Sequence, residues 1–451
     1  MTHDQHPDQH PDQHPDQHPH PGPVGGHPRR RGRMLPLVLA CGVFMGGLLG
    51  GGVVALPGTA GAVAGTPVIV IGPRLPVPTR VPAPRPSPAP TSTTTPSPSP
   101  RPASGSSPAP VVTGDSFVPR SGLAVGDPTA PSNEILTRLM DNIRHTPPGA
   151  TIRIVGYSFS LTRVSSALLA AHARGVQVQV VMDGHSGQWA PAKDLVPVLG
   201  TDPHADSFFV LTHGSARGTG GVTHQKTWMF SQVGRTPDVV MVGSTNLTGY
   251  GTSVQFSDTF TYTDRADVYG VYSALFATQK LDQAVTDPFV ETTFDHGGAY
   301  FFPRPGTTAA TDPVVARIAA LPSSSSTVIR VAQFSWWDTR GSWIAQALAA
   351  KKRAGAVVEV VAGESVSSRV RSVLTGAGIP IHSGVYADGK RIHTKLMLAE
   401  YQDASGRHDS VWTGSDNWAN ESFRNEETML RVDDSPAYGD YVRFFDLLDG
   451  R

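Results

Sequence analysis

The chain has 451 residues, with 37 Lys and Arg, 37 Asp and Glu, and a single cysteine, Cys41, which excludes an intramolecular disulfide. The first 112 residues hold eight Arg and four Asp, which leaves 29 basic and 33 acidic side chains in residues 113–451 and a net charge of −4 there. This charge argues against strong non-specific nucleic-acid binding, because such binding requires a basic surface.

The first 112 residues predict no folded domain. Residues 1–33 repeat "HPDQ" and end in a basic cluster, so we expect a disordered tail. Residues 34–64 are uncharged and apolar enough for either a signal peptide or an uncleaved membrane anchor, and the sequence leaves both open. Residues 65–112 form a linker rich in Pro, Ser and Thr. Basic residues before the apolar segment place the rest of the chain outside the cytoplasm, secreted or tethered to the membrane.

The remainder of the chain contains one pattern twice. Thr151–Gly184 resembles Thr327–Glu364: each has a β-rich run, an aromatic-containing turn, an Ala/Leu-rich helix that stops at a glycine, and a Val-rich strand. Near-continuous Val and Ile runs are typical of strands that are covered on both faces. The repeat predicts two homologous α/β domains, at residues 113–305 and 306–451.

Each half then carries the same polar residues in the same order: a histidine, a lysine two positions later, a Gly-Ser-x-Asn segment and an acid. The sets are His224, Lys226, Ser244, Asn246 and Asp258, and His393, Lys395, Ser415, Asn417 and Glu427. The histidine and the acid are 34 positions apart in both sets. Because residues i and i+2 of a strand share a face, we expect each histidine and lysine to point the same way, and both sets to meet between the halves.

This combination of residue types suits a phosphodiester. Lysines and asparagines supply positive charge and neutral donors for phosphoryl oxygens. Two histidines can serve as nucleophile and general acid, and a carboxylate beside each can fix its tautomer. The pattern contains no cluster of carboxylates, histidines and cysteines that predicts a metal, so we expect neither a metal nor another cofactor.

At these residues the chain resembles the phospholipase D superfamily, whose motif is His-x-Lys-x4-Asp followed by a Gly-Ser-x-Asn type segment. The resemblance implies two α/β domains, each a mixed sheet flanked by helices, packed about a pseudo-two-fold axis with the active site at their interface. It also implies a metal-independent reaction through a phosphohistidine. The aspartate position of the motif holds Ser231 in the first half and Glu400 in the second, which departs from the family pattern.

The resemblance further implies a role for each residue. His224 attacks phosphorus, and His393 protonates the leaving alcohol and then activates water or an acceptor alcohol. The acids act crosswise, with Glu427 orienting His224 and Asp258 orienting His393. The phosphoryl oxygens are held by Lys226, Lys395, Asn246 and Asn417, with Ser244 and Ser415 as supporting donors. Both motifs lie in one chain, so we expect a monomer.

The expected substrate is a phospholipid at a membrane surface, because export and the net charge of −4 favour a lipid over a polyanion. The aromatic stretches at residues 294–302 and 335–338 either line an entrance for acyl chains or belong to the core. The expected enzyme is therefore a phosphoric diester hydrolase of the phospholipase D type. The alternatives are an extracytoplasmic nuclease, a cardiolipin-synthase-like phosphatidyltransferase and, last, a non-catalytic phosphodiester-binding protein.

Overall fold

The computed structural model describes residues 115–451. The expected tail, apolar segment and linker lie outside the described residues, so these expectations stay predictions. Among the helices of residues 115–451, none is both long and apolar enough to cross a membrane.

The first half is built on a mixed sheet in the order β1-β7-β6-β5-β2-β3-β4. Its strands are β1 (Gly122–Gly126), β2 (Thr151–Gly156), β3 (Gln177–Asp183), β4 (Phe208–Thr212), β5 (Thr227–Val233), β6 (Thr236–Gly243) and β7 (Gln255–Tyr262). Its helices are α1 (Glu134–His145), α2 (Thr162–Ala173), the 3-10 segment η1 (Gly184–Gln188), α3 (Ala190–Leu199), α4 (Gly249–Ser253) and α5 (Ala266–Gln279). Buried side chains of α1, α2 and α3 pack on one face of this sheet.

The second half repeats this plan in the order β12-β11-β10-β14-β15-β16-β9-β8. Its strands are β8 (Val290–Phe294), β9 (Gly297–Phe301), β10 (Val328–Trp336), β11 (Val357–Val366), β12 (Ile381–Ser383), β14 (Lys395–Asp403), β15 (Gly406–Gly414) and β16 (Thr428–Val432). Its helices are α6 (Pro313–Ala320), α7 (Asp338–Arg353), α8 (Ser368–Gly376), the 3-10 segment η2 (Asn420–Phe423) and α9 (Ser435–Asp449). Here α6, α7 and α8 cover the outer face.

The predicted βαβ repeat is confirmed. β2 and β3 are parallel and joined through α2, and β10 and β11 are parallel and joined through α7. Both helices end before a glycine, Gly175 at φ +93° and Gly355 at φ +107°, where a side chain would be strained. The expected class, two α/β halves with mixed sheets flanked by helices, is therefore what the structure shows.

The expected division after residue 305 does not follow the sheets. β8 and β9 precede that point, but β9 pairs antiparallel with β16 and so extends the second sheet. Every residue of β9 is buried. A strand with such a side-chain pattern is more stable against the open edge of β16 than it would be in a surface linker.

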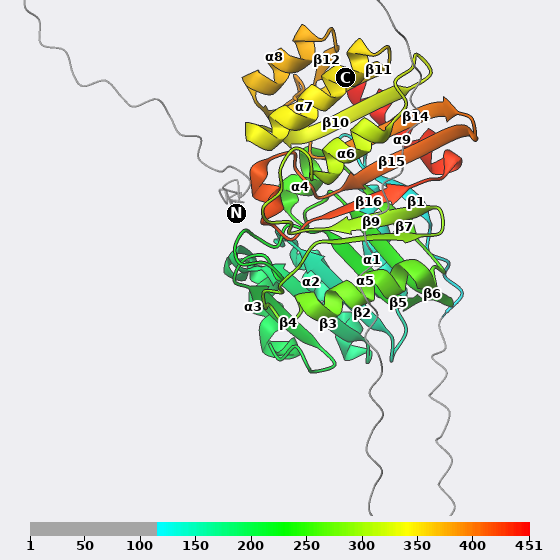
Figure 1. Cartoon of the computed structure of the whole chain (residues 1–451). Helices are drawn as coiled ribbons and strands as arrows, with labels where there is room; N and C mark the ends of the chain where they lie inside the picture. The colour runs from blue at the N-terminus through cyan, green and yellow to red at the C-terminus, as the bar shows by residue number, and fades with distance from the viewer. Residues whose placement is uncertain (1–114) are drawn as a thin grey trace, which may run out of the picture. The chain divides into compact units, whose positions relative to one another are not determined.

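The two sheets share one hydrophobic core. It contains Tyr272 of α5 and Phe256 of β7 from the first half together with Tyr441 of α9 and Leu396 of β14 from the second. A short strand of the second half, β13 (Arg391–Ile392), crosses over and pairs with β7. Figure 1 shows the second half, in yellow to red, resting on the cyan and green first half with β1, β7, β9 and β16 near their junction.

Candidate active site

The two His-x-Lys segments enter the junction between the halves just before a strand begins. β5 starts at Thr227 and β14 starts at Lys395, so both histidines precede their strands, which corrects the expectation that they lie on the strand itself. Each histidine is instead held by the opposite half. His224 donates its backbone N–H to Glu426 O at 2.9 Å, and His393 donates to Phe256 O at 2.7 Å. This crossed pairing is what a pseudo-two-fold arrangement requires.

The lysines occupy matching positions. Lys226 Nζ donates to His224 O at 2.6 Å, and Lys395 Nζ donates to His393 O at 2.7 Å. Each ammonium also lies over an aromatic ring, that of Tyr157 at 5.3 Å in one half and that of Phe334 at 4.8 Å in the other. Both lysines are buried, so cation–π attraction is stronger here than at an exposed site.

Tyr157 and Phe334 also pack against the histidines, with ring centroids 4.8 Å from His224 and 4.7 Å from His393. Sequence reasoning did not name them as site residues. The signal was present, because both belong to the aromatic stretch at the end of the first strand of each repeat: Tyr157 directly follows β2, and Phe334 lies near the end of β10. An aromatic residue in the same place in both copies, close to a motif with buried cations, indicates a functional position.

His224 faces a carboxylate of the other half. Its Nδ1 lies 2.9 Å from Glu427 Oε2 and 3.0 Å from Oε1, and the Glu427 carboxylate is completely buried. Asn425 Nδ2 donates to the same carboxylate at 3.3 Å. Burial raises the pKa of Glu427 to about 7, while the positive charge of Lys226 acts in the opposite direction. When Glu427 is ionised, it accepts a hydrogen bond from Nδ1–H of His224, and Nε2 then carries the lone pair.

His393 has a different neighbour at Nδ1, the backbone oxygen of Ser244 at 2.9 Å. Lys395 Nζ lies 3.2 Å from its Nε2. A carbonyl fixes the orientation of an imidazole, but it stabilises the charged imidazolium less than a carboxylate does. The two histidines therefore sit in chemically different environments.

The strand register corrects the expected match between Asp258 and Glu427. Gly243 pairs with Thr259, and Gly414 pairs with Met429. Thr259 and Met429 therefore match, and the residue that corresponds to Glu427 is Ser257, two positions before Thr259. The equal spacing of 34 was misleading, because the segments between the motifs differ in length on either side of the Gly-Ser-x-Asn segments.

Asp258 is one position further along β7 and points into a buried cluster of hydroxyl groups. Its carboxylate accepts hydrogen bonds from Thr394 Oγ1 at 2.6 Å, Ser244 Oγ at 2.8 Å and Tyr441 OH at 3.2 Å, and also from Thr413 Oγ1. Thr394 directly follows His393, and Ser244 supplies the carbonyl that faces the His393 ring. The structure thus brings Asp258 close to His393 through these two residues.

The Gly-Ser-x-Asn segments bend beneath the site. A Cβ on Gly243 would lie 2.1 Å from Asp258 O, and one on Gly414 would lie 2.2 Å from Thr428 O, so only glycine fits. Ser244 Oγ accepts from Asp258 N and Ser415 Oγ from Thr428 N, each at 3.0 Å. The two serines therefore fasten neighbouring strands together. The predicted phosphate ligands Asn246 and Asn417 follow in this bend and are buried.

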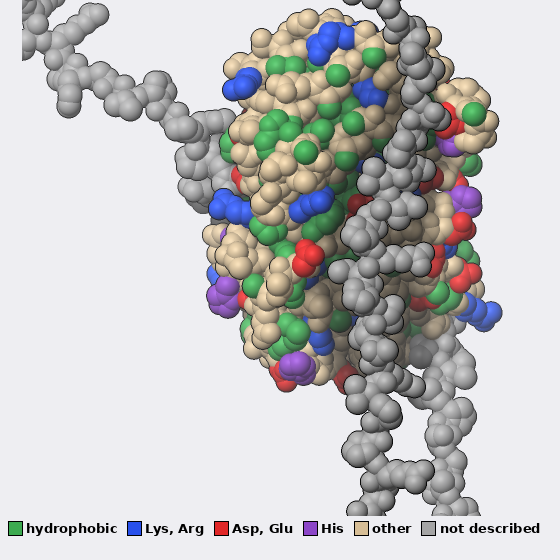
Figure 2. All heavy atoms as spheres, viewed as in Figure 1, with side chains coloured by type: hydrophobic (Ala, Val, Ile, Leu, Met, Phe, Trp, Pro, Cys, Tyr) green, Lys and Arg blue, Asp and Glu red, His purple; other side chains and the backbone are tan. Residues whose placement is uncertain are grey.

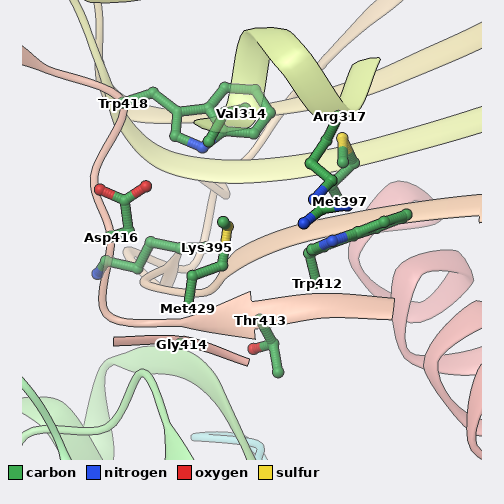
Figure 3. Close-up of a pocket in the computed structure, with 10 residues that line it drawn as sticks. All are labelled: Val314, Arg317, Lys395, Met397, Trp412, Thr413, Gly414, Asp416, Trp418 and Met429. Atoms are coloured by element: carbon green, nitrogen blue, oxygen red, sulfur yellow. The ribbon is translucent and has the colours of Figure 1, made fainter. Parts of the chain in front are cut away.

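In the second half, a buried ion network that sequence reasoning missed holds this bend. Arg340 of α7 donates to Asp416 Oδ1 at 2.7 Å and Oδ2 at 2.9 Å, and to Asp312 at 2.8 Å. Burial raises the pKa of Asp416 to about 6, while Arg340 opposes the rise. Lys395, Asp416 and Trp418 border a cavity of about 10 Å³ (Figure 3), enough for about one water molecule.

The two departures from the family motif lie further along the strands. Ser231 Oγ accepts the backbone N–H of Thr151 at 2.8 Å. Glu400 forms an ion pair with Arg407 at 2.8 Å. Both side chains support neighbouring strands, so neither departure removes a group that contacts the histidines. Within residues 115–451, no group of three or more His, Cys, Asp or Glu side chains is arranged to hold a metal ion.

Comparison with known proteins covers both halves. A family model described as "Cardiolipin synthase, PLD-like domain" matches residues 139–278 and 318–448. A search of curated proteins found no match.

Several solved structures are similar. A phosphatidylserine synthase from Haemophilus influenzae is 11% identical, with a TM-score of 0.49, and the match covers 72% of this chain and 86% of that one. A polyphosphate kinase from Porphyromonas gingivalis is 13% identical with a TM-score of 0.47; the match covers 73% of this chain but only 50% of the kinase. The phospholipase D family member Nuc from Salmonella typhimurium is 18% identical with a TM-score of 0.26, over 34% of this chain and 90% of Nuc.

The two matched segments of the family model cover more than half of the 451 residues, and they coincide with the two halves that meet at His224 and His393. The chain therefore belongs to the phospholipase D-like family, with one family domain in each half.

Proposed function

We propose that this protein is a phosphodiesterase of the phospholipase D type that cleaves or transfers phospholipid headgroups through a phosphohistidine at His224. The observation that carries the proposal is the contact between His224 of the first half and Glu427 of the second, at 2.9 Å in a buried site that also holds Lys226 and Lys395. A nucleophile needs such a partner, because the carboxylate stabilises the positive charge that develops on the ring.

The two environments support the following reaction. His224 Nε2 attacks phosphorus, and a P–N bond forms as the bond to the leaving oxygen breaks. His393 donates a proton to that oxygen, and Lys226 and Lys395 stabilise the negative charge on the other phosphoryl oxygens. In the second step His393 takes a proton from water or an alcohol, whose oxygen attacks phosphorus and releases His224.

Charge and surface support a lipid substrate. Residues 113–451 carry a net charge of −4, and the uncovered Lys and Arg side chains in Figure 2 lie apart from one another rather than in one basic stripe. The aromatic stretches contribute less to an entrance than one reading of the sequence allowed: Trp336, Tyr300, Phe301 and Phe302 are buried core residues. Trp337 is the exception, because it is 37% exposed. Its backbone N–H donates to the backbone oxygen of Trp418, which directly follows Asn417. An exposed Trp beside the segment that carries Asn417 suits a membrane interface.

A second candidate is a phosphatidyltransferase, in which an alcohol rather than water takes the phosphatidyl group. The description of the matching family model, which names cardiolipin synthase, favours it. The same site performs both reactions, because the acceptor enters only after the phosphohistidine has formed.

One assay tests the proposal. Purified protein is incubated with phosphatidylcholine vesicles, with phosphatidylglycerol vesicles, and with plasmid and single-stranded DNA, in EDTA and at two salt concentrations. We expect headgroup release or transfer that depends little on salt, and poor DNA cleavage. A His224→Asn variant controls for contaminating enzymes. Efficient, salt-sensitive DNA cleavage with intact vesicles would show that the protein is a nuclease.

We also propose that residues after about 113 lie outside the cytoplasm, supported by the "RRRGR" cluster before an uncharged apolar segment. A reporter that works only in the cytoplasm, fused to the C-terminus, should give no signal. Strong signal would contradict this location, and mass spectrometry of the exported protein would separate a cleaved signal peptide from an anchor.

A further inference from the structure

A second group of titratable side chains lies next to the first histidine but outside the site described so far. His185 of η1 places Nδ1 2.5 Å from Asp183 Oδ1 and Nε2 3.0 Å from Ser158 Oγ. Asp183 and Ser158 are buried, whereas the His185 side chain is 22% exposed. The structure therefore contains a hydrogen-bonded chain from an aspartate through a histidine to a serine, at the ends of β2 and β3.

This chain contacts the catalytic segment at two points. The other oxygen of Asp183, Oδ2, accepts the backbone N–H of Thr223 at 2.9 Å, and Thr223 directly precedes His224. The His185 ring packs on Tyr157 at 4.2 Å between centroids, and Tyr157 packs in turn on His224 and Lys226. Ser186, next to His185, donates its hydroxyl to Tyr157 O at 2.7 Å. A single short segment thus holds both the backbone just before His224 and the ring beside it.

The second half has no counterpart to this arrangement. Gly156 pairs with Met182, and Gln333 pairs with Ala362, so Gly363 occupies the position of Asp183. A Cβ on Gly363 would lie 2.5 Å from Phe334 O, so the backbone itself fills the space there. Ser335 occupies the position of Ser158, so the hydroxyl recurs, whereas the carboxylate and the imidazole occur only beside the histidine that also has Glu427.

We propose that Asp183 and His185 are a positioning pair for the nucleophile, Asp183 acting through Thr223 and His185 acting through Tyr157. The inference rests on the proposed function, because it assigns the pair to the half that attacks phosphorus. Ser158 supports this pair, because its hydroxyl group fixes His185 Nε2. Displacing a reacting group by about 1 Å costs up to about a hundredfold in rate, so loss of the pair should slow attack without weakening substrate binding.

The test measures phosphoenzyme formation by the full-length protein in single turnover, with a p-nitrophenyl phosphodiester as substrate. His185→Ala should lower the rate of phosphoenzyme formation about tenfold and leave KM nearly unchanged. His185→Gln, which can still reach Ser158, should recover part of the rate. Thermal unfolding of each variant separates positioning from loss of fold.

The chain offers a matched control in His213, whose Nδ1 lies 2.6 Å from Asp282 and whose side chain is 95% exposed. His213→Ala removes the same kind of pair away from Tyr157 and should keep wild-type rates. Should His185→Ala fail to fold, Ser186→Ala removes only the bond to Tyr157 O and should lower the same rate. The positioning pair alone is overturned if the wild type is active and His185→Ala forms the phosphoenzyme as fast as His213→Ala. The same holds if a folded Ser186→Ala forms it as fast as His213→Ala. A wild type that forms no phosphoenzyme with any phosphodiester overturns the proposed function and this inference with it.

Discussion

The two halves of this protein share their motifs but not the surroundings of their histidines. Both place a lysine under the histidine carbonyl and over an aromatic ring. Only His224 faces a carboxylate, Glu427, because the matching position in the first half holds Ser257. The duplicated fold thus keeps the buried lysines in both copies, whereas the groups that contact Nδ1 of the two histidines differ.

The supporting residues are also divided between the halves. In the first half, Asp183 and His185 contact the residues around the histidine. In the second half, Arg340 and Asp312 hold the Gly-Ser-Asp-Asn bend. Asp258 lies between these systems and accepts hydroxyl hydrogen bonds from both halves. A variant in one half therefore has a matched variant in the other half or elsewhere in the same chain.

The largest effect should come from the histidines themselves. His224→Asn should form no phosphoenzyme, whereas His393→Asn should form it and accumulate it when the leaving group is good. Each variant should lose at least about 10³-fold in steady-state rate. Trapping of phosphoenzyme with labelled substrate checks this. The opposite trapping pattern would exchange the two roles, and full activity of both variants would remove the catalytic assignment.

The second-largest effect on the rate should come from Glu427, compared with Ser257 at the matching position. Glu427→Gln removes the charge that supports His224, and a loss of about 10²–10⁴-fold is expected by analogy with a triad aspartate. Ser257→Ala should change the rate less than about tenfold, because Ser257 bonds to Thr245 Oγ1 and supplies no carboxylate. Initial rates of the two variants measure the difference. Equal losses would mean that the histidines are supported symmetrically.

The buried ion network around Arg340 predicts that matched arginine substitutions in the two halves differ in their effect on stability. Arg340→Met leaves Asp312 and Asp416 buried without their partner and should cost about 3–5 kcal/mol in the free energy of unfolding. Arg163, at the matching position of the first half, is exposed, so Arg163→Met should cost less than about 0.5 kcal/mol. Urea denaturation of both variants tests this, and a small effect of Arg340→Met would show that the network is not needed for folding.

The smallest effect concerns pH. Burial raises the pKa of Glu427 to about 7 from 4.5, and that of Asp416 to about 6 from 3.8. Between about pH 4 and 7 the folded protein therefore binds more protons than the unfolded chain. These groups make the free energy of unfolding fall as pH rises, by on the order of 1–3 kcal/mol for Glu427.

Urea denaturation at pH 5 and pH 7.5 measures this slope. Glu427→Gln should flatten it, whereas the control Glu400→Gln should keep the wild-type slope, because Glu400 pairs with Arg407 near the surface. An unchanged slope in Glu427→Gln would mean that this carboxyl does not take up the extra proton in the folded state.

Much of the fold could be predicted from the sequence, because local patterns carry it. The two βαβ units follow from Val-rich runs, an Ala/Leu helix and the glycines at residues 175 and 355, and all of these act within some 40 residues. The motif residues were also visible, since a histidine and lysine two positions apart recur in a duplicated chain. The strands at residues 290–301 were assigned to the wrong half, because their partner β16 lies far away in the sequence.

By itself, the sequence determined which residues could do chemistry on a phosphodiester: two histidines, two lysines and two asparagines in repeated order. Only the tertiary structure decided how they are paired. The match between Ser257 and Glu427 depends on strand register, which long-range hydrogen bonds fix and spacing along the chain does not. The contacts of His224 with Glu427, of Asp183 with Thr223 and of Arg340 with Asp416 join segments far apart in the chain. Such contacts form only when the two sheets pack on a common core, so no local sequence pattern predicts them.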